Sequence, residues 1–296
     1  MSIKIKKNED IYLDRWEIIE GNAFDCRILV SPYNRRITVY EFNLTRDNAA
    51  KEMLKVLAEK ASENSLDKIW LKSKTGYRNA FTGAGMKLEA AIPGYYKGEE
   101  TALVFALYLS KQRQIPSNDR GKELVDKVIS KSKGVTVKRI LSEGITMKWG
   151  EKEHCPALAR LYRKVFTTYP FPVFDPDYLK STIEQDSTYY ITAWHNRELI
   201  AASSAEINRP QQNAEMTDFA TLPQWRGHGL AGFLLEQMET RLKEERFRCL
   251  YTIARSSSIG MNSVFGNAGY GYYGVLIKNC NIGVGFEDMN VWAKLL

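Results

Sequence analysis

The sequence is poor in the residues that hold metals and disulfides. It contains four cysteines and three histidines in 296 residues, with no C-x-x-C pair and no two histidines close together. Zinc sites and disulfide frameworks need such residues at short, characteristic spacings, so we expect neither a metal site nor a disulfide framework. His154 and Cys155 are adjacent, but neighbouring positions of a helix point in different directions, which favours a structural cysteine over a thiol nucleophile.

Long hydrophobic runs are absent as well. The longest strongly apolar stretch, 102–109, is far shorter than the about 18 to 20 residues that span a bilayer. The first residues show no signal-peptide pattern. We therefore expect a cytoplasmic protein with no membrane partner. With 44% hydrophobic residues, the chain can form two modest cores or one large core, and two domains are the favoured interpretation.

The net charge of +7 is confined to one segment. Nine Lys or Arg and three Asp or Glu lie between Lys111 and Arg139, whereas the rest of the chain is almost balanced. Turn-forming residues near Pro116 and Gly134 flank a short helical pattern in this segment, which favours a solvated connector over an anion-binding arm. No basic stripe interleaved with aromatic residues is present, so we expect no nucleic-acid partner.

Periodicity predicts a smaller N-terminal α/β domain (1–115), a basic connector (116–140) and a second α/β domain (141–296). In the first domain we expect strands at 26–30, 36–42 and 68–71, and a helix at 48–62. In the second we expect strands at 146–149, 188–194, 199–207, 214–220, 249–254, 272–278 and 288–293, and helices at 154–166, 178–183, 229–245 and 259–267. The pattern is typical of a mixed α/β sheet covered by helices.

The turn between the strand at 214–220 and the helix after it is the most informative stretch. It reads Pro-Gln-Trp-Arg-Gly-His-Gly-Leu-Ala from Pro223 to Ala231. Two glycines at the entrance to a helix let successive backbone N–H groups face one point, where the helix adds partial positive charge. Such a turn suits a pyrophosphate. Its spacing differs from both the dinucleotide G-x-G-x-x-G and the P-loop patterns.

This turn resembles the R-x-x-G-x-G/A signature of the GNAT superfamily of acetyltransferases, here Arg226 to Ala231. The resemblance implies a preceding strand, a following amphipathic helix, another strand, a short helix and a G-[FY] turn, and the chain supplies each in order as far as Gly269-Tyr270. It also implies acetyl-CoA as co-substrate and a mostly antiparallel sheet with helices on both faces. The coenzyme ligands expected from it are Phe219, Ala220, Thr221, Gln224, Arg226, Gly227, His228, Gly229, Leu230, Ala231, Asn262 and Phe265.

Part of the N-terminal domain resembles the second domain in the order of its sequence features. Gly85-Met86, followed by 90–96 and 101–109, resembles in layout Gly269-Tyr270 and the two strands that follow it. The N-terminal domain is therefore interpreted as a possible diverged GNAT-like copy that lacks the glycine turn.

Further motifs resemble the β-lysine N-acetyltransferases. They lie in both domains: 92–96 (IPGYY), 169–172 (YPFP), 215–229, 260–265 (GMNSVF) and 287–292 (EDMNVW). In that family the product is β-lysine acetylated on its terminal (epsilon) amine, a compatible solute accumulated under salt stress. The resemblance thus implies a small-molecule amine substrate and covers nearly the whole chain.

Acetyl transfer to a lysine-like amine requires removal of a proton, since such an amine has a pKa near 10.4. The candidate carboxylates are Asp218, Glu215 and Glu206, with Asp218 ranked first because it lies nearest to the glycine turn. Strand residues alternate between two faces, so a structural role for Asp218 is equally compatible with the sequence. The N–H of Phe219 or Ala220 is the expected oxyanion donor.

The general acid and the acceptor pocket are less well defined. Many GNAT enzymes carry a tyrosine where this chain has Phe265, so the thiolate leaves unassisted, or Tyr270, Tyr272 or a water protonates it. In the 166–177 loop, Tyr169, Phe171 and Asp175 are the candidate substrate-binding residues, against a reading of ordinary loop packing.

Other functions remain compatible with the sequence. The acceptor could instead be a polyamine, lysine or a protein lysine, and Phe265 also fits a non-catalytic acetyl-CoA-binding module. A homodimer is compatible with the sequence.

Overall fold

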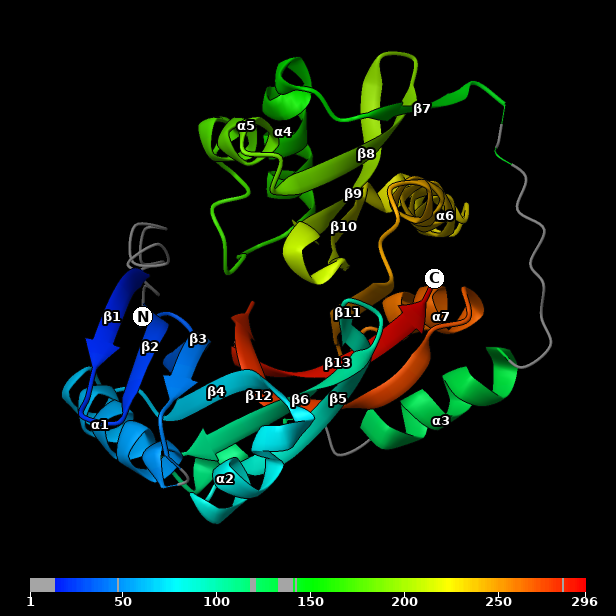
Figure 1. Cartoon of the computed structure of the whole chain (residues 1–296). Coiled ribbons are helices and arrows are strands. Elements are labelled where there is room, and N and C mark those ends of the chain that lie inside the picture. Colours follow the sequence, from blue (N-terminus) through cyan, green and yellow to red (C-terminus); the bar gives the residue numbers. More distant parts are fainter. Residues whose placement is uncertain (1–13, 47, 118–120, 133–140, 142, 284) are drawn as a thin grey trace, which may run out of the picture.

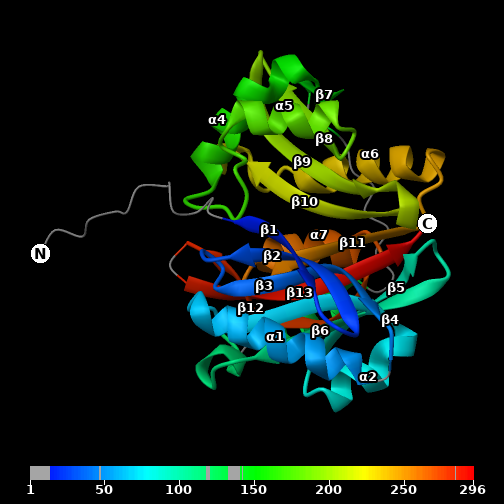
Figure 2. The ribbon, with the colours of Figure 1, turned by 60° about the vertical axis from the view of Figure 1, so that its left-hand side comes forward.

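The computed structural model of the chain describes residues 14–46, 48–117, 121–132, 141, 143–283 and 285–296. Within these residues, thirteen strands form one mixed sheet in the order β1-β2-β3-β4-β6-β5-β12-β13-β11-β10-β9-β8-β7. Figures 1 and 2 show that the sheet curves, so that strands β7 to β10 stand over the N-terminal strands, whereas β11, β12 and β13 lie beside the latter. The mixed α/β sheet expected from the sequence is confirmed.

The N-terminal half (residues 14–117) forms one side of this sheet. Its main elements in chain order are β1 (Arg15–Glu20), β2 (Phe24–Ser31), β3 (Arg36–Leu44), α1 (Ala49–Glu63), β4 (Lys68–Lys74), α2 (Arg78–Gly83), β5 (Lys87–Tyr96) and β6 (Glu100–Tyr108). Helix α1 forms because Met53, Leu57 and Ala61 recur at helical spacing and become fully buried. They pack with strand residues in a core beneath the sheet.

The C-terminal half (residues 121–296) forms the other side. Its main elements are α3 (Gly121–Ser132), β7 (Ile145–Trp149), α4 (Cys155–Val165), α5 (Pro176–Glu184), β8 (Thr188–His195), β9 (Glu198–Asn208), β10 (Asn213–Thr221), α6 (Leu230–Glu244), β11 (Cys249–Arg255), α7 (Ile259–Asn267), β12 (Gly271–Ile282) and β13 (Gly285–Leu295). These elements enclose a second, larger core.

The two halves share one strand order. The N-terminal order β1-β2-β3-β4-β6-β5 corresponds to β8-β9-β10-β11-β13-β12 in the C-terminal half. In each half one neighbouring pair is parallel, β3 with β4 and β10 with β11, and a helix connects its strands. This correspondence supports the interpretation of the N-terminal domain as a diverged copy, without counterparts of β7, α4 and α5 in its described residues.

The halves join where β5 meets β12. Gly274 of β12 pairs with Ala90 of β5. The φ angle of Gly274 is +139°, and a Cβ on it would stand 2.3 Å from the carbonyl oxygen of Glu89. Only glycine allows the strands this close approach. A third core, with side chains from both halves, covers the junction.

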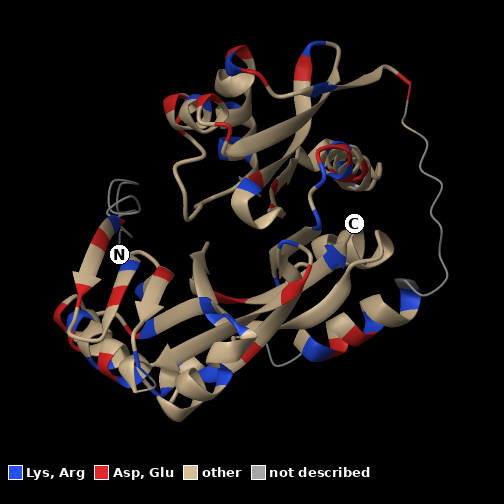
Figure 3. Cartoon of the chain, viewed as in Figure 1, with Lys and Arg blue, Asp and Glu red and all other residues tan. Residues whose placement is uncertain are grey.

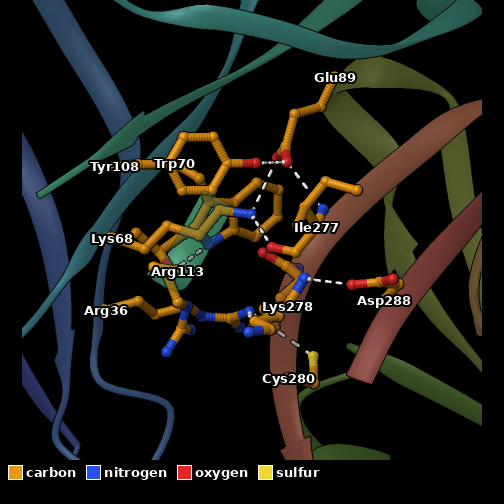
Figure 4. A network of polar contacts seen from close by, with 12 residues as sticks. Arg36, Lys68, Trp70, Glu89, Tyr108, Arg113, Ile277, Lys278, Cys280 and Asp288 are labelled. Atoms are coloured by element: carbon orange, nitrogen blue, oxygen red, sulfur yellow. Dashed lines mark hydrogen bonds and ion pairs between the residues drawn. The ribbon is translucent and has the colours of Figure 1, made fainter. Parts of the chain in front are cut away.

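A buried polar network beside this junction also links the halves (Figure 4). The Nζ of Lys68, on β4, donates to Glu89 Oε2 at 2.9 Å and to the carbonyl oxygen of Ile277, on β12, at 2.8 Å. Glu89 accepts in turn from the N–H of Ile277 at 2.7 Å and from the hydroxyl of Tyr108. Because the side chains of Lys68 and Glu89 are buried and Tyr108 is half-buried, these polar atoms need partners, and the network fixes how the two halves meet.

Part of the expected connector is the helix α3, which packs against α7. Its Val125 and Val128 are buried in the C-terminal core. Its lysines alternate with Glu123 and Asp126, so charges of both signs lie along the helix (Figure 3). Residues 118–120 and 133–140 of the connector lie outside the described residues, and the expected domain boundaries stay a prediction.

No helix within the described residues is long and apolar enough for a membrane span. Across the same residues, no three of His, Cys, Asp and Glu come together as a metal-binding group.

Candidate active site

The glycine turn has the geometry of an anion cradle. Gly227 and Gly229 have φ angles of +83° and +72°, and Gly229 caps helix α6 without a side-chain hydrogen bond. Apart from each glycine and its two chain neighbours, no heavy atom of the described residues lies within 4 Å of the position where either glycine would carry a Cβ. A ligand can therefore approach the backbone closely, where the first N–H groups of α6 have no partner within the helix. The turn fits the pyrophosphate of coenzyme A.

Strands β10 and β11 separate next to this turn. Their parallel register runs only from Asn213 to Glu215 of β10. Beyond it, a bulge between Thr217 and Ala220 shifts the pairing of β10 with β9. The N–H groups of Phe219 and Ala220 lie in this splayed region, where one of them remains the predicted oxyanion donor.

A cavity of about 540 Å³ lies between the two halves of the molecule. The C-terminal half contributes strands β9 to β13 and the 169–171 loop, and the N-terminal half contributes β3, β4 and residues 95–96 of β5. It is large enough for a small amino acid or amine. Of the predicted site residues, Glu206, Glu215, Tyr169 and Phe171 line it together.

The C-terminal wall of the cavity is acidic. Glu206 and Glu215 occupy paired positions of β9 and β10, so both carboxylates project from the same face. The side chain of Glu206 is exposed to the cavity. Desolvation deep between the halves, followed by the charges of Glu215 and Asp218, raises its pKa to about 8. Desolvation also raises the pKa of Glu215. A carboxyl group with a pKa of about 8 is largely protonated at neutral pH and becomes a proton acceptor as the pH rises through that value.

Asp218 was the first candidate for the base, but its side chain is held in hydrogen bonds away from the cavity wall. It has a φ angle of +53° within the bulge and is buried. Its carboxylate accepts hydrogen bonds from Ser204 at 2.5 Å and from the hydroxyl of Tyr169. Burial raises its pKa, and these hydrogen bonds act against that shift. Because its oxygens are engaged, Asp218 is well placed to orient Tyr169, while Glu206 and Glu215 face the cavity; a direct catalytic role for Asp218 stays a prediction.

The N-terminal wall carries positive charge, from residues that no sequence motif predicted to be part of the site. Lys72 of β4 and Arg36 of β3 both line the cavity. The Nζ of Lys72 lies 5.2 to 5.5 Å from the ring centroids of Trp70, Tyr95 and Tyr251. Desolvation acts to lower the pKa of Lys72. The charges of Tyr95 and Glu215 act in the opposite direction, and the net effect raises the pKa, so the side chain stays cationic.

Arg36 is more firmly tethered than Lys72. Its guanidinium donates to the carbonyl oxygen of Asn279 and lies 5.2 Å from the ring centroid of Trp70. One signal in the sequence could have identified this wall, because Trp70 and Lys72 lie two residues apart on a strand and so share a face. The sequence does not show that this face lies opposite β10.

Two predicted coenzyme residues have structural contacts. Asn262 is buried; its Nδ2 donates to the carbonyl oxygen of Arg255, and its Oδ1 accepts from Asn290 and Trp292. These bonds hold α7 against β11 and β13. Phe265 is buried, and its ring packs edge-on against Phe219 and Tyr270. The coenzyme contacts of Asn262 and Phe265 stay predictions.

Asp175, predicted to bind substrate, caps helix α5. Its side chain is exposed and accepts a hydrogen bond from the N–H of Asp177 at 2.9 Å. The cavity wall does not include Asp175. Its position is explained by capping alone, and its contact with substrate stays a prediction.

The remaining predicted coenzyme residues surround the glycine turn. Gln224, Arg226 and His228 are exposed, Thr221 and Ala231 are half-buried, and Leu230 anchors the first turn of α6 in the core. The turn is thus accessible on the outside and fixed from within.

Comparison with known proteins gives a consistent relationship. The family model described as Acetyltransferase (GNAT) family matches residues 155–270. N-acetyltransferase YodP of Bacillus subtilis (strain 168) is 37% identical over 268 residues, which cover 89% of this chain and 94% of the relative.

Two archaeal relatives are named Beta-lysine N(6)-acetyltransferase. The protein from Methanococcus maripaludis is 35% identical over 94% of this chain and 98% of its own length. The protein from Methanosarcina mazei is 33% identical over 72% of this chain and 85% of its own length. This chain therefore belongs to the GNAT family and is an acetyl-CoA-dependent N-acetyltransferase.

Proposed function

We propose that this enzyme acetylates the terminal (epsilon) amine of β-lysine. The observation that carries the proposal is the polarity of the cavity, which has Glu206 and Glu215 on one wall and Lys72 and Arg36 on the other. A diamino acid has ammonium and carboxylate groups that complement both walls. The names of the two archaeal relatives support the same substrate.

The residues around the cavity divide the work of the reaction. Glu206, with Glu215 beside it, attracts the ammonium group and accepts the proton that the amine must lose. Tyr169, oriented by Asp218, closes the cavity next to the splayed strands. The N–H of Phe219 or Ala220 stabilises the developing oxyanion. Acetyl-CoA supplies the activated thioester when it is bound at the glycine turn.

The same cavity distinguishes the alternative acceptors. A polyamine matches the two glutamates but brings no anion to Lys72 and Arg36, whose charges would repel its second amine. A lysine within a protein would have to enter between two halves that share one sheet. Free lysine carries the same groups as β-lysine and is the closest competitor.

The test measures thiol release from acetyl-CoA with β-lysine, lysine, spermidine and a lysine-containing peptide as separate acceptors. We expect the highest kcat/KM with β-lysine, and low values with spermidine and the peptide. A preference for spermidine or the peptide would contradict the substrate while leaving the enzyme class intact. Absence of turnover with every amine would contradict catalysis and favour a binding module.

The coenzyme site is tested with Gly229→Trp, whose side chain is expected to fill the cradle and raise the KM for acetyl-CoA. Gly85→Trp is the matched control, because Gly85 also has a positive φ of +93° and open space at its Cβ position. Gly85 lies in the N-terminal half, away from the glycine turn. An equal loss in both variants would indicate backbone strain rather than a blocked site.

A further inference from the structure

Lys72 is a cation on which the charges of Glu215 and Glu206 act from the opposite wall of the cavity. Among the ion pairs of the described residues, none includes Lys72, and its hydrogen bond to the hydroxyl of Tyr251 is long, at 3.4 Å. Three aromatic rings surround its Nζ. These rings hold the ammonium in place and exclude water from its sides, but they do not neutralise its charge. A cation fixed in this way on a cavity wall can accept an anionic group from a ligand.

The internal correspondence of the two halves explains how Lys72 comes to face the acidic wall. Arg36 pairs with Lys68 at the start of β3 and β4, as Asn213 pairs with Cys249 at the start of β10 and β11. Counting along the strands from these pairs matches residues of β3 with residues of β10, and residues of β4 with residues of β11. The equivalent pairs are Arg36 and Asn213, Thr38 and Glu215, Tyr40 and Thr217, Trp70 and Tyr251, and Lys72 and Ile253.

All ten of these residues line the cavity. The cavity therefore lies between two equivalent faces, one from each half, that have diverged in charge. The C-terminal face has Glu215 where the N-terminal face has Thr38, and the N-terminal face has Lys72 where the C-terminal face has Ile253. Among these ten residues, the C-terminal half thus provides the negative group and the N-terminal half the positive groups, and Glu41 of β3 also lines the cavity.

We propose that Lys72 binds the carboxylate of the acceptor and thereby makes the N-terminal half the part of the enzyme that selects amino acids over simple diamines. The inference rests on the proposed function, because it takes an amino acid as the acceptor. Bound substrate would lie between Lys72 and the glutamates. Its carboxylate would contact the Nζ of Lys72, and its reacting amine would point toward the splayed part of β10 and β11. Arg36, behind Trp70, adds positive charge to the same wall.

The test compares β-lysine with its decarboxylated counterpart, a diamine that keeps both amines. In Lys72→Met we expect kcat/KM for β-lysine to fall about 10- to 100-fold, mainly through KM, as for the loss of one charge-assisted hydrogen bond. The kcat/KM for the diamine should stay the same or rise. Lys72→Arg should restore part of the activity with β-lysine, since it keeps the charge.

Lys74→Met is the matched control, because Lys74 lies on the same strand but is exposed and pairs with Glu100 at 3.2 Å. It should leave both substrates unaffected. Equal losses with both substrates in Lys72→Met would overturn the inference in favour of a structural role, and so would an unchanged KM for β-lysine.

Calorimetric titration of β-lysine without coenzyme gives a readout that does not depend on turnover. We expect weaker binding to Lys72→Met than to the wild type, and equal affinity, or no binding to either, would overturn the inference. Wild-type turnover of the diamine but not of β-lysine or lysine would instead contradict the proposed function. Normal β-lysine turnover with no effect of the mutation would contradict the role of Lys72 alone.

Discussion

At the scale of single residues, the site depends on which carboxylates reach the cavity. Proximity to the glycine turn favours Asp218, but a bulge turns its side chain toward Ser204 and Tyr169. Glu206 and Glu215 lie on the regular part of their strands, where alternation directs both to the cavity. The alternation of a strand predicts side-chain direction only up to the first bulge.

Glu206→Gln tests the proposed base. The pKa of Glu206 is about 8, so it is protonated and unable to accept a proton below that pH. In the wild type, kcat/KM for the amine should rise with pH through about 8. The substitution should lower kcat/KM about 100-fold or more and remove this rise.

Glu198→Gln is the control for this change, because Glu198 lies on the same strand but is exposed and pairs with Lys164. Its pH profile should match that of the wild type. A Glu206→Gln variant with the wild-type pH profile would exclude Glu206 as the base.

At the scale of elements, one close contact between β5 and β12 extends the sheet across both halves. Gly274 lies at this contact with its Cβ position inside van der Waals distance of the β5 backbone. The neighbouring network of Lys68, Glu89 and Ile277 depends on the same approach. The position of the N-terminal wall relative to the C-terminal wall therefore follows from the packing of two strands.

Gly274→Ala should force β5 and β12 apart and destabilise the protein by about 1 to 3 kcal/mol or more, as expected for overpacking together with backbone strain. Unfolding by urea measures this change. Gly83→Ala is the control, since a Cβ at Gly83, in helix α2, meets no atom within 4 Å. Similar urea midpoints for the two variants would show that the close contact is not required.

At the scale of the whole molecule, the two halves have the same strand order but carry different functional features. The C-terminal half has the glycine turn and the splayed strands β10 and β11, whereas the N-terminal half supplies Lys72, Arg36 and an aromatic wall. A ligand in the cavity contacts both, so its binding free energy should stabilise both halves together.

Hydrogen exchange measured by mass spectrometry tests this coupling. Saturating β-lysine should slow amide exchange in β4 as well as in β9 and β10. Acetyl-CoA alone should slow exchange mainly around 226–231 and in the adjoining strands. Protection by β-lysine that is confined to the C-terminal half would contradict a cavity shared by the two halves.

The sequence by itself determined the enzyme family and predicted the position of the coenzyme turn, because both depend on residues that are contiguous in the chain. The glycine turn from Arg226 to Gly229 and the helix after it form locally, and short-range spacing is sufficient to recognise them. The order of the elements along the chain around this turn was implied by the same motifs. Glu206 and Glu215 were also identifiable, since they lie on neighbouring strands of one domain.

Only the tertiary structure decided which residues of the N-terminal half line the cavity. Lys72 and Glu215 are far apart in the chain, and they face one another because β5 pairs with β12 through Gly274 and the sheet then curves. Periodicity shows which side chains share a face of a strand, but it does not show which face lies opposite. That information lies in long-range strand pairing and packing, which no local pattern encodes.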